Sequence, residues 1–165
     1  MFSSPLPALA ETALAFKGLM LGAEIAPLFA DARIECHPLR TAAADQVCSL
    51  RHGARETIAG APVNSIFWYA RAGRLTRILI NLDARHFETV SQALVQRHGP
   101  AQEKSELIRT LDGREHRNRT LTWQRGAHRL VAERYAGQIN LSRIRFIDDH
   151  AETATSVPRA PQDDL

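Results

Sequence analysis

Cys36 and Cys48 are the only cysteines of the chain, and their spacing admits several kinds of chemistry. In an oxidising compartment an even cysteine count favours one disulfide, and closing a loop of this length stabilises a fold by roughly 3 kcal/mol in the chain-entropy model. The nearby His37 and His52 raise metal binding as an alternative, but they match no standard zinc spacing. A redox pair would prefer C-x-x-C. The pattern favours a Cys36–Cys48 disulfide over metal binding or two free buried thiols.

A second group of residues with chemical potential lies in the segment RTLDGREHRNRT, residues 109–120. Its basic side chains are Arg109, Arg114, His116, Arg117 and Arg119. One interpretation is a solvated loop and strand edge, whose charges discourage pairing with another sheet. The other is a binding patch for an acidic partner or for anionic groups such as lipid headgroups. The segment lacks interleaved aromatic residues of the kind that stack on single-stranded bases.

The sequence contains no recognisable catalytic constellation. The motifs G-x-S-x-G and H-E-x-x-H, the P-loop and the dinucleotide-binding fingerprint are all absent. The seven histidines are scattered. His98 is expected near a helix C-terminus, where a cation is stabilised by the helix dipole. The triplet Asp148-Asp149-His150 is more typical of a solvated segment than of a metal site. We therefore expect no enzyme, no metal and no cofactor.

The N-terminal stretch MFSSPLPALAET bears on the compartment. Ala8-Leu9-Ala10 places small residues where a signal peptidase cuts, but no basic region or apolar segment of about 7–15 residues precedes it. Residues 1–10 are thus either the remnant of a signal peptide or an N-terminal tail. No apolar run approaches the ~20 residues of a membrane span. We expect a periplasmic or secreted protein, with the cytoplasm as the alternative.

Composition is that of an ordinary folded chain. The 165 residues are 44% hydrophobic and 24% charged, which suits one domain or two small similar modules. The isoelectric point of 9.3 accompanies a net charge of only +3. Lys17 and Lys104 are the only lysines, and an arginine-rich, lysine-poor chain reflects a GC-rich genome more often than a nucleic-acid surface. A nucleic-acid binder would show clustered basic residues in a recognisable module.

The first half of the chain reads as two helices and a hairpin. Helical spacing in AEIAPLFADARI predicts a helix that starts late or bends at Pro27. Residues 41–50 predict a second short helix with Thr41 as N-cap, which the disulfide would pin to the end of the first. Residues 57–82 then alternate as β-branched and aromatic strands that turn at Gly73, with a short further strand at 57–59.

The second half reads as one helix followed by strands. Residues 83–100 predict a helix capped by Asp83 and ended by Gly99-Pro100. Strands are expected at 106–111 and 141–147, and a hairpin at 119–135. The segment from His150 to residue 165 shows no periodicity and predicts a disordered tail.

These elements predict an α+β domain at residues 11–149, with helices packed on one face of an antiparallel sheet. Residues 16–82 and 83–149 echo each other and could be degenerate repeats. The sequence does not decide which face of each strand points inward, so the expected core includes residues from both faces of some strands. It comprises Phe67, Tyr69, Leu75, Ile78, Ile80, Phe87, Val90, Leu94, Leu121, Trp123, Leu130, Val131, Ile144 and Phe146.

The order of these segments carries a resemblance. FKGLMLG with a following helix, the hairpin TIAGAPVNSIFWYARAGRLTRILI, the helix end at His98-Gly99-Pro100 and a strand tryptophan resemble small exported helix-plus-sheet modules. These are the SmpA/OmlA-type outer-membrane-assembly lipoproteins and the β-lactamase inhibitory proteins. The chain lacks the lipid-anchor cysteine of the first group. The resemblance covers residues 16–147, and it implies architecture but no binding residues.

Three functions therefore compete at this stage. The first is an exported, non-catalytic module, such as an inhibitor, assembly factor or accessory subunit, that binds another protein of the cell envelope. The second is a cytoplasmic basic domain that binds nucleic acid, which needs reduced cysteines and salt-sensitive binding. The third is a small hydrolase with an unrecognised site, which needs a pocket with perturbed titrating groups.

Overall fold

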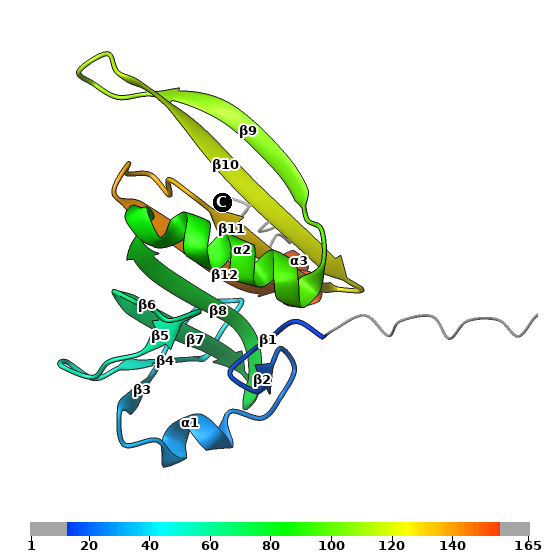
Figure 1. The fold of residues 1–165 in the computed structure, drawn as a ribbon. Helices are drawn as coiled ribbons and strands as arrows, with labels where there is room; N and C mark the ends of the chain where they lie inside the picture. The colour runs from blue at the N-terminus through cyan, green and yellow to red at the C-terminus, as the bar shows by residue number, and fades with distance from the viewer. Residues whose placement is uncertain (1–12, 156–165) are drawn as a thin grey trace, which may run out of the picture.

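The computed structural model describes residues 13–155, so the expected signal-peptide remnant at 1–10 and the tail beyond 155 lie outside the described residues. Its main feature is one eight-stranded antiparallel sheet in the order β3-β4-β7-β8-β12-β11-β10-β9 (Figure 1). The strands are β3 (Ile34–Pro38), β4 (Gln46–Leu50), β7 (Ser65–Arg71), β8 (Arg74–Asp83), β9 (Gln102–Arg109), β10 (Glu115–Arg125), β11 (His128–Glu133) and β12 (Leu141–Asp148). The fold is a sheet-dominated α+β domain.

Within the described residues, two short hairpins and three α-helices accompany the sheet. The hairpins pair β1 (Ala15–Phe16) with β2 (Leu19–Met20) and β5 (Thr57–Ile58) with β6 (Ala61–Pro62). The strand expected at residues 57–59 is therefore half of a separate small hairpin. The helices are α1 (Ala26–Ala30), α2 (Phe87–His98), which follows the 3-10 turn Ala84–His86, and α3 (Asp149–Thr155).

The sheet is assembled from two consecutive meanders. The strands β3, β4, β7 and β8 follow one another across one half, and β9, β10, β11 and β12 follow one another across the other. The two halves meet where β8 pairs antiparallel with β12, with Ile80 opposite Ile144. The pairing of β8 with β12 is named the seam below.

The strand register lines up buried side chains on one face of the sheet, named here the covered face. Trp68, Ile78, Phe146, Leu130 and Trp123 are direct partners on five successive strands, and each is buried. Alternate residues point to the opposite face, named here the open face. Helix α2 lies across the covered face (Figure 1) and buries Phe87, Val90 and Leu94.

The predicted helix at residues 83–100 is confirmed, with its start and stop signals. The Asp83 carboxylate accepts a hydrogen bond from the Arg85 backbone N–H at 2.9 Å. Helix α2 ends at His98 and is capped by Gly99, whose φ of 83° is readily adopted by glycine alone. The stripe Phe87, Val90 and Leu94 faces the sheet as its spacing predicts.

The second helix predicted at residues 41–50 is wrong. The Thr41 hydroxyl accepts a hydrogen bond from the Ala44 N–H at 3.1 Å, which makes a local turn instead of a helix cap. Residues from Gln46 then pair with β3, and Cys48 lies directly opposite Cys36. The predicted disulfide is confirmed, but it joins two strands. Helix α1 begins late, at Ala26, with Pro27 in its first turn as expected, and it is only five residues long.

The segment from His150 onward does not begin as an irregular tail. Asp149–Thr155 form helix α3, so the expectation of disorder is corrected for residues 150–155. The α3 carboxylates contact open-face residues: Asp149 lies 3.0 Å from the Arg129 guanidinium, and Glu152 lies 3.6 Å from that of Arg77. The helices therefore do not all lie on one face of the sheet.

The expected core is confirmed except at β7. Phe67 and Tyr69 are only half-buried on the open face, whereas Ile66 and Trp68 are buried on the covered face. A register shift at Tyr69/Ala70 interrupts the pairing of β7 with β8. This shift brings Leu75 and Ile78, three positions apart, to the covered face.

Candidate functional site

The β9–β10 hairpin is the part of the fold most open to a partner. Strand β9 is an edge strand (Figure 1), and seven of its eight residues are exposed. The hairpin tip is fixed by its own hydrogen bonds. The Asp112 carboxylate accepts from the Thr110 hydroxyl and from the Arg114 N–H, and Gly113 has a φ of 83°. The tip thus presents its outer side chains from a defined turn.

The five residues of the predicted patch do not form one free cationic surface. Arg109 lies 2.6 Å from the Glu115 carboxylate, and Arg114 lies 3.3 Å from that of Asp112. These pairs are exposed at the hairpin tip, where such ion pairs contribute little to stability. They reduce the net charge that the tip presents to an incoming molecule.

Arg119 has a structural position. Its guanidinium donates to the carboxylate of Glu88 on α2 and to that of Glu103 on β9, each at 2.6 Å. Its side chain is 26% exposed. The hydrogen bond from Arg119 holds the pKa of Glu103 below its usual value, and the same hydrogen bond raises the pKa of Arg119. Arg119 therefore fastens the edge strand to the helix.

The remaining two patch residues point to opposite sides of the hairpin. His116 packs edge-on against Tyr135 on the open face, with ring centres 5.9 Å apart. Arg117 is exposed on the other side, directly opposite Leu107 of β9. Strand alternation separates neighbours in sequence in this way.

A groove runs along the open side of the hairpin tip. It has a volume of about 1010 Å³ and is bounded by the tip and by the loop between β11 and β12. Leu111 on the tip is fully exposed, and Ile139 on the loop is 44% exposed. Arg109 and Arg114 lie on its rim. The sequence did not single out Leu111 or Ile139, because their exposure depends on how the loop meets the hairpin.

Four arginines gather on the open face between the groove and α3. This arginine cluster consists of Arg77 on β8, Arg143 and Arg145 on β12, and Arg129 on β11, three neighbouring strands. Burial lowers the pKa of Arg145 below its usual value, Glu133 opposes this shift, and the other three arginines lower it further. The buried Nε of Arg145 has no hydrogen-bond partner among the described residues.

The arginine cluster was missed at the level of sequence. Each strand shows arginine at alternate or isolated positions, and LSRIRFI displays two of them. Alternation could place these side chains on one face of β12. Their meeting with Arg77 and Arg129 requires the strand order, in which β8 and β11 flank β12.

His98 lies in the last turn of α2, as expected, but its side chain is buried. It is 5% exposed, and its ring lies edge-on to that of Trp123 at 6.4 Å. Burial lowers the pKa of His98, and the positive charges of Arg97 and Arg125 lower it further. Burial thus opposes the favourable effect of the helix dipole on the charged form of His98.

Within residues 13–155 no group of three or more histidine, cysteine or acidic side chains is arranged to hold a metal ion. The same described part contains no helix with the length and hydrophobicity to cross a membrane. Cys48 is buried and Cys36 is half-buried in the disulfide.

No family model, curated protein or solved structure matches the chain.

Proposed function

We propose that the protein is an exported, non-catalytic module that binds another protein of the cell envelope through the groove beside the β9–β10 hairpin. The observation that carries this proposal is the exposure of Leu111 and Ile139 on the two sides of that groove. Apolar side chains at the centre of a surface and polar ones at its rim are the usual anatomy of a protein interface.

The charged residues of the groove suit an acidic partner. Arg109 and Arg114 lie on the rim, beside exposed carboxylates that could exchange for those of a partner. Rim charges speed encounter more than they deepen affinity. Arg119 is excluded from direct contact in this proposal because it is already held by Glu88 and Glu103.

Two further observations support export of the protein and an origin of its two halves by duplication. A disulfide with one buried cysteine suits an oxidising compartment, in keeping with the Ala8-Leu9-Ala10 pattern. Each half of the chain contains a helix followed by a four-stranded meander, and the final strands of both meanders form the seam. Duplication of one helix-plus-meander unit would produce this arrangement. The repeated helix-plus-meander arrangement also supports the resemblance to SmpA/OmlA-type and β-lactamase inhibitory modules.

The test is capture of a partner from an extract of exported proteins, followed by association kinetics. The variant L111S/I139S removes the apolar pair, and Phe29→Ser is the control because Phe29 is 57% exposed on α1, away from the hairpin (Figure 1). We expect the wild type and Phe29→Ser to retain one saturable partner and L111S/I139S to lose it. Equal binding by all three proteins would exclude the groove, and no saturable partner for the wild type would refute protein binding.

The arginine cluster favours a second candidate, binding of single-stranded nucleic acid on the open face. Arg77 stacks over the Tyr69 ring at 4.2 Å, so guanidinium and aromatic groups lie side by side there. Such binding should weaken steeply as salt rises. Fluorescence anisotropy with a labelled oligonucleotide at two salt concentrations, for wild type and R143Q/R145Q, distinguishes this candidate from the first.

A further inference from the structure

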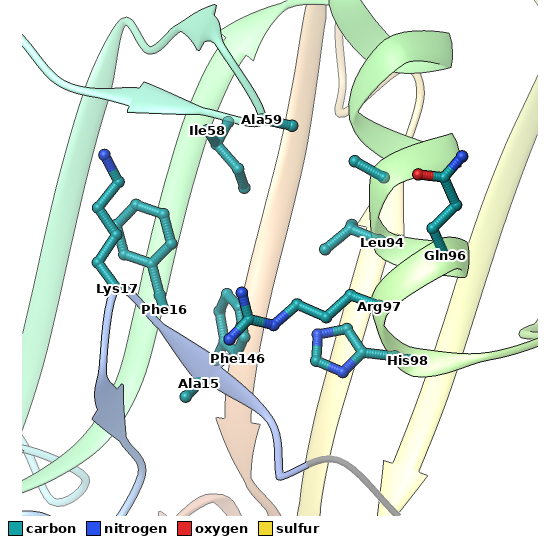
Figure 2. Close-up of a pocket in the computed structure, with 11 residues that line it drawn as sticks. Ala15, Phe16, Lys17, Ile58, Ala59, Leu94, Gln96, Arg97, His98 and Phe146 are labelled. Atoms are coloured by element: carbon teal, nitrogen blue, oxygen red, sulfur yellow. The ribbon is translucent and has the colours of Figure 1, made fainter.

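A second cavity lies on the covered face, away from the groove. It has a volume of about 500 Å³ and is framed by the β1–β2 hairpin, the β5–β6 hairpin and the last turns of α2. Figure 2 shows Phe146 of β12 between these elements, with Phe16 and Leu94 on either side. The volume falls within the range of small-molecule sites in proteins, about 300–1,000 Å³.

The walls of this cavity are mainly apolar. Phe16, Ile58, Leu94 and Phe146 line it, and each is no more than 7% exposed. Their packing leaves a space that apolar groups could fill without displacing a hydrogen-bonded side chain. An aliphatic chain is the simplest occupant for such walls.

Polar groups are concentrated at one end of the cavity, the last turn of α2. His98 lines it there, and the buried Nδ1 of His98 has no hydrogen-bond partner among the described residues. Because this atom has almost no accessible surface, a ligand in the cavity would lie beside the His98 ring without reaching Nδ1.

Arg97 adds a positive charge to the same end. In Figure 2 its guanidinium extends from α2 over the cavity towards Phe146. Among the described residues no carboxylate lies within salt-bridge distance of Arg97. Lys17, on the opposite rim, is bonded to Glu56 and is therefore already neutralised. The charge available to a ligand thus lies beside His98.

The geometry points to a binding site for a medium-chain aliphatic carboxylate. The carboxylate would accept hydrogen bonds from the Arg97 guanidinium, beside the buried His98 ring. The chain would extend over Phe146 towards Phe16 and Ile58. This site is independent of the proposed protein-binding groove, because the two are lined by different residues on opposite faces of the sheet.

Isothermal titration of the full chain with decanoate, below its micelle concentration, tests the proposal. We expect saturable binding of one decanoate per chain. Arg97→Gln should weaken it about tenfold to a hundredfold, the usual range for a charge-assisted hydrogen bond. Arg117→Gln is the matched control, an exposed arginine on the hairpin, and should bind decanoate as the wild type does. Decanol, with the same chain and no charge, should bind the wild type as weakly as decanoate binds Arg97→Gln.

A second variant tests the position of the chain independently of charge. Ala93 lines the cavity on α2, and Ala93→Phe should fill part of it and abolish decanoate binding. Circular dichroism melting of each variant shows whether it is folded. Absence of saturable binding to the wild type, equal affinity of Arg97→Gln, or unchanged binding by folded Ala93→Phe would each overturn the proposal.

Discussion

At one edge of the sheet, β3 is five residues long, ends at Pro38 and is bonded to β4 by the Cys36–Cys48 disulfide. At the other edge, β9 is eight residues long and almost fully exposed, and side-chain bonds through Arg119 link it to α2. Proline cannot donate a ladder hydrogen bond, and a short covalently held strand offers little to a new strand or partner. The difference shows one edge built for stability and the other left accessible, which is the basis for placing a binding surface at β9.

The largest change in the free energy of unfolding is expected for a variant in α2, whose contacts with the covered face support both edges of the sheet. Leu94 of α2 is 7% exposed, and Leu94→Ala should lower the free energy of unfolding by about 2–5 kcal/mol. Urea denaturation of the two proteins measures this change. A loss below about 0.5 kcal/mol would show that α2 does not anchor the covered face and that the two edges are stabilised separately.

Removal of the disulfide tests directly whether the β3 edge of the sheet is the stabilised one. The variant C36A/C48A should lower the free energy of unfolding by about 2–4 kcal/mol, because the reduced unfolded chain regains conformational freedom. Urea denaturation of wild type with and without reductant provides a second measurement of the same quantity. Decanoate and partner binding should persist at conditions where the variant is folded. Equal stability with and without the disulfide would remove the proposed distinction between the edges.

Loss of the Arg119 ion pairs tests the β9 edge of the sheet. Arg119→Met should lower the free energy of unfolding by about 1 kcal/mol, a modest value because Glu88 and Glu103 are about half-exposed. Hydrogen exchange should quicken in β9 more than in β3, which distinguishes local loosening from general destabilisation. Uniform acceleration across the sheet would contradict the role of Arg119 as a local fastening.

The smallest effect is a pH dependence at the junction of α2 and β9. Because the pKa of His98 is lowered in the folded state, the unfolded chain binds a proton at higher pH than the folded chain does. The contribution of His98 to stability is therefore present above its unfolded pKa of about 6.5 and is lost as pH falls below it. His98→Gln should remove this part of the slope. Parallel stability curves for both proteins between pH 5 and 8 would contradict the argument.

Local patterns predicted the elements whose partners lie nearby in sequence. The β7–β8 hairpin, α2 and the β10–β11 hairpin all follow from residue period and turn chemistry. The pattern failed at residues 41–50, where alanines favour a helix but pairing with β3 decides the structure. It also misplaced the inward face of β7, because both faces carry aromatic residues and only the neighbouring strands determine which is buried.

The candidate sites were predictable to a smaller extent. The cysteine pair and the basic character of the hairpin are visible in the sequence, but the ion pairs that occupy Arg109, Arg114 and Arg119 depend on register and on the position of α2. The cavity beside His98 needs three elements that are far apart in the chain. Sites of this kind form only when distant segments of the chain pack together, and a single sequence contains no local signal for them.

The seam between β8 and β12 has a consequence for how the chain folds. Its partners are distant in sequence: the Arg143 side chain bonds that of Asn81 across 62 positions. Contacts of long sequence separation form slowly because the intervening loop must first lose entropy. We expect each meander to form early and the seam to close last, with β8 and β12 protected from hydrogen exchange later than β10 and β11 in a pulse-labelling experiment. Until closure, Ile80 and Ile144 would lie on unpaired strand edges, where crowded refolding would favour association between chains.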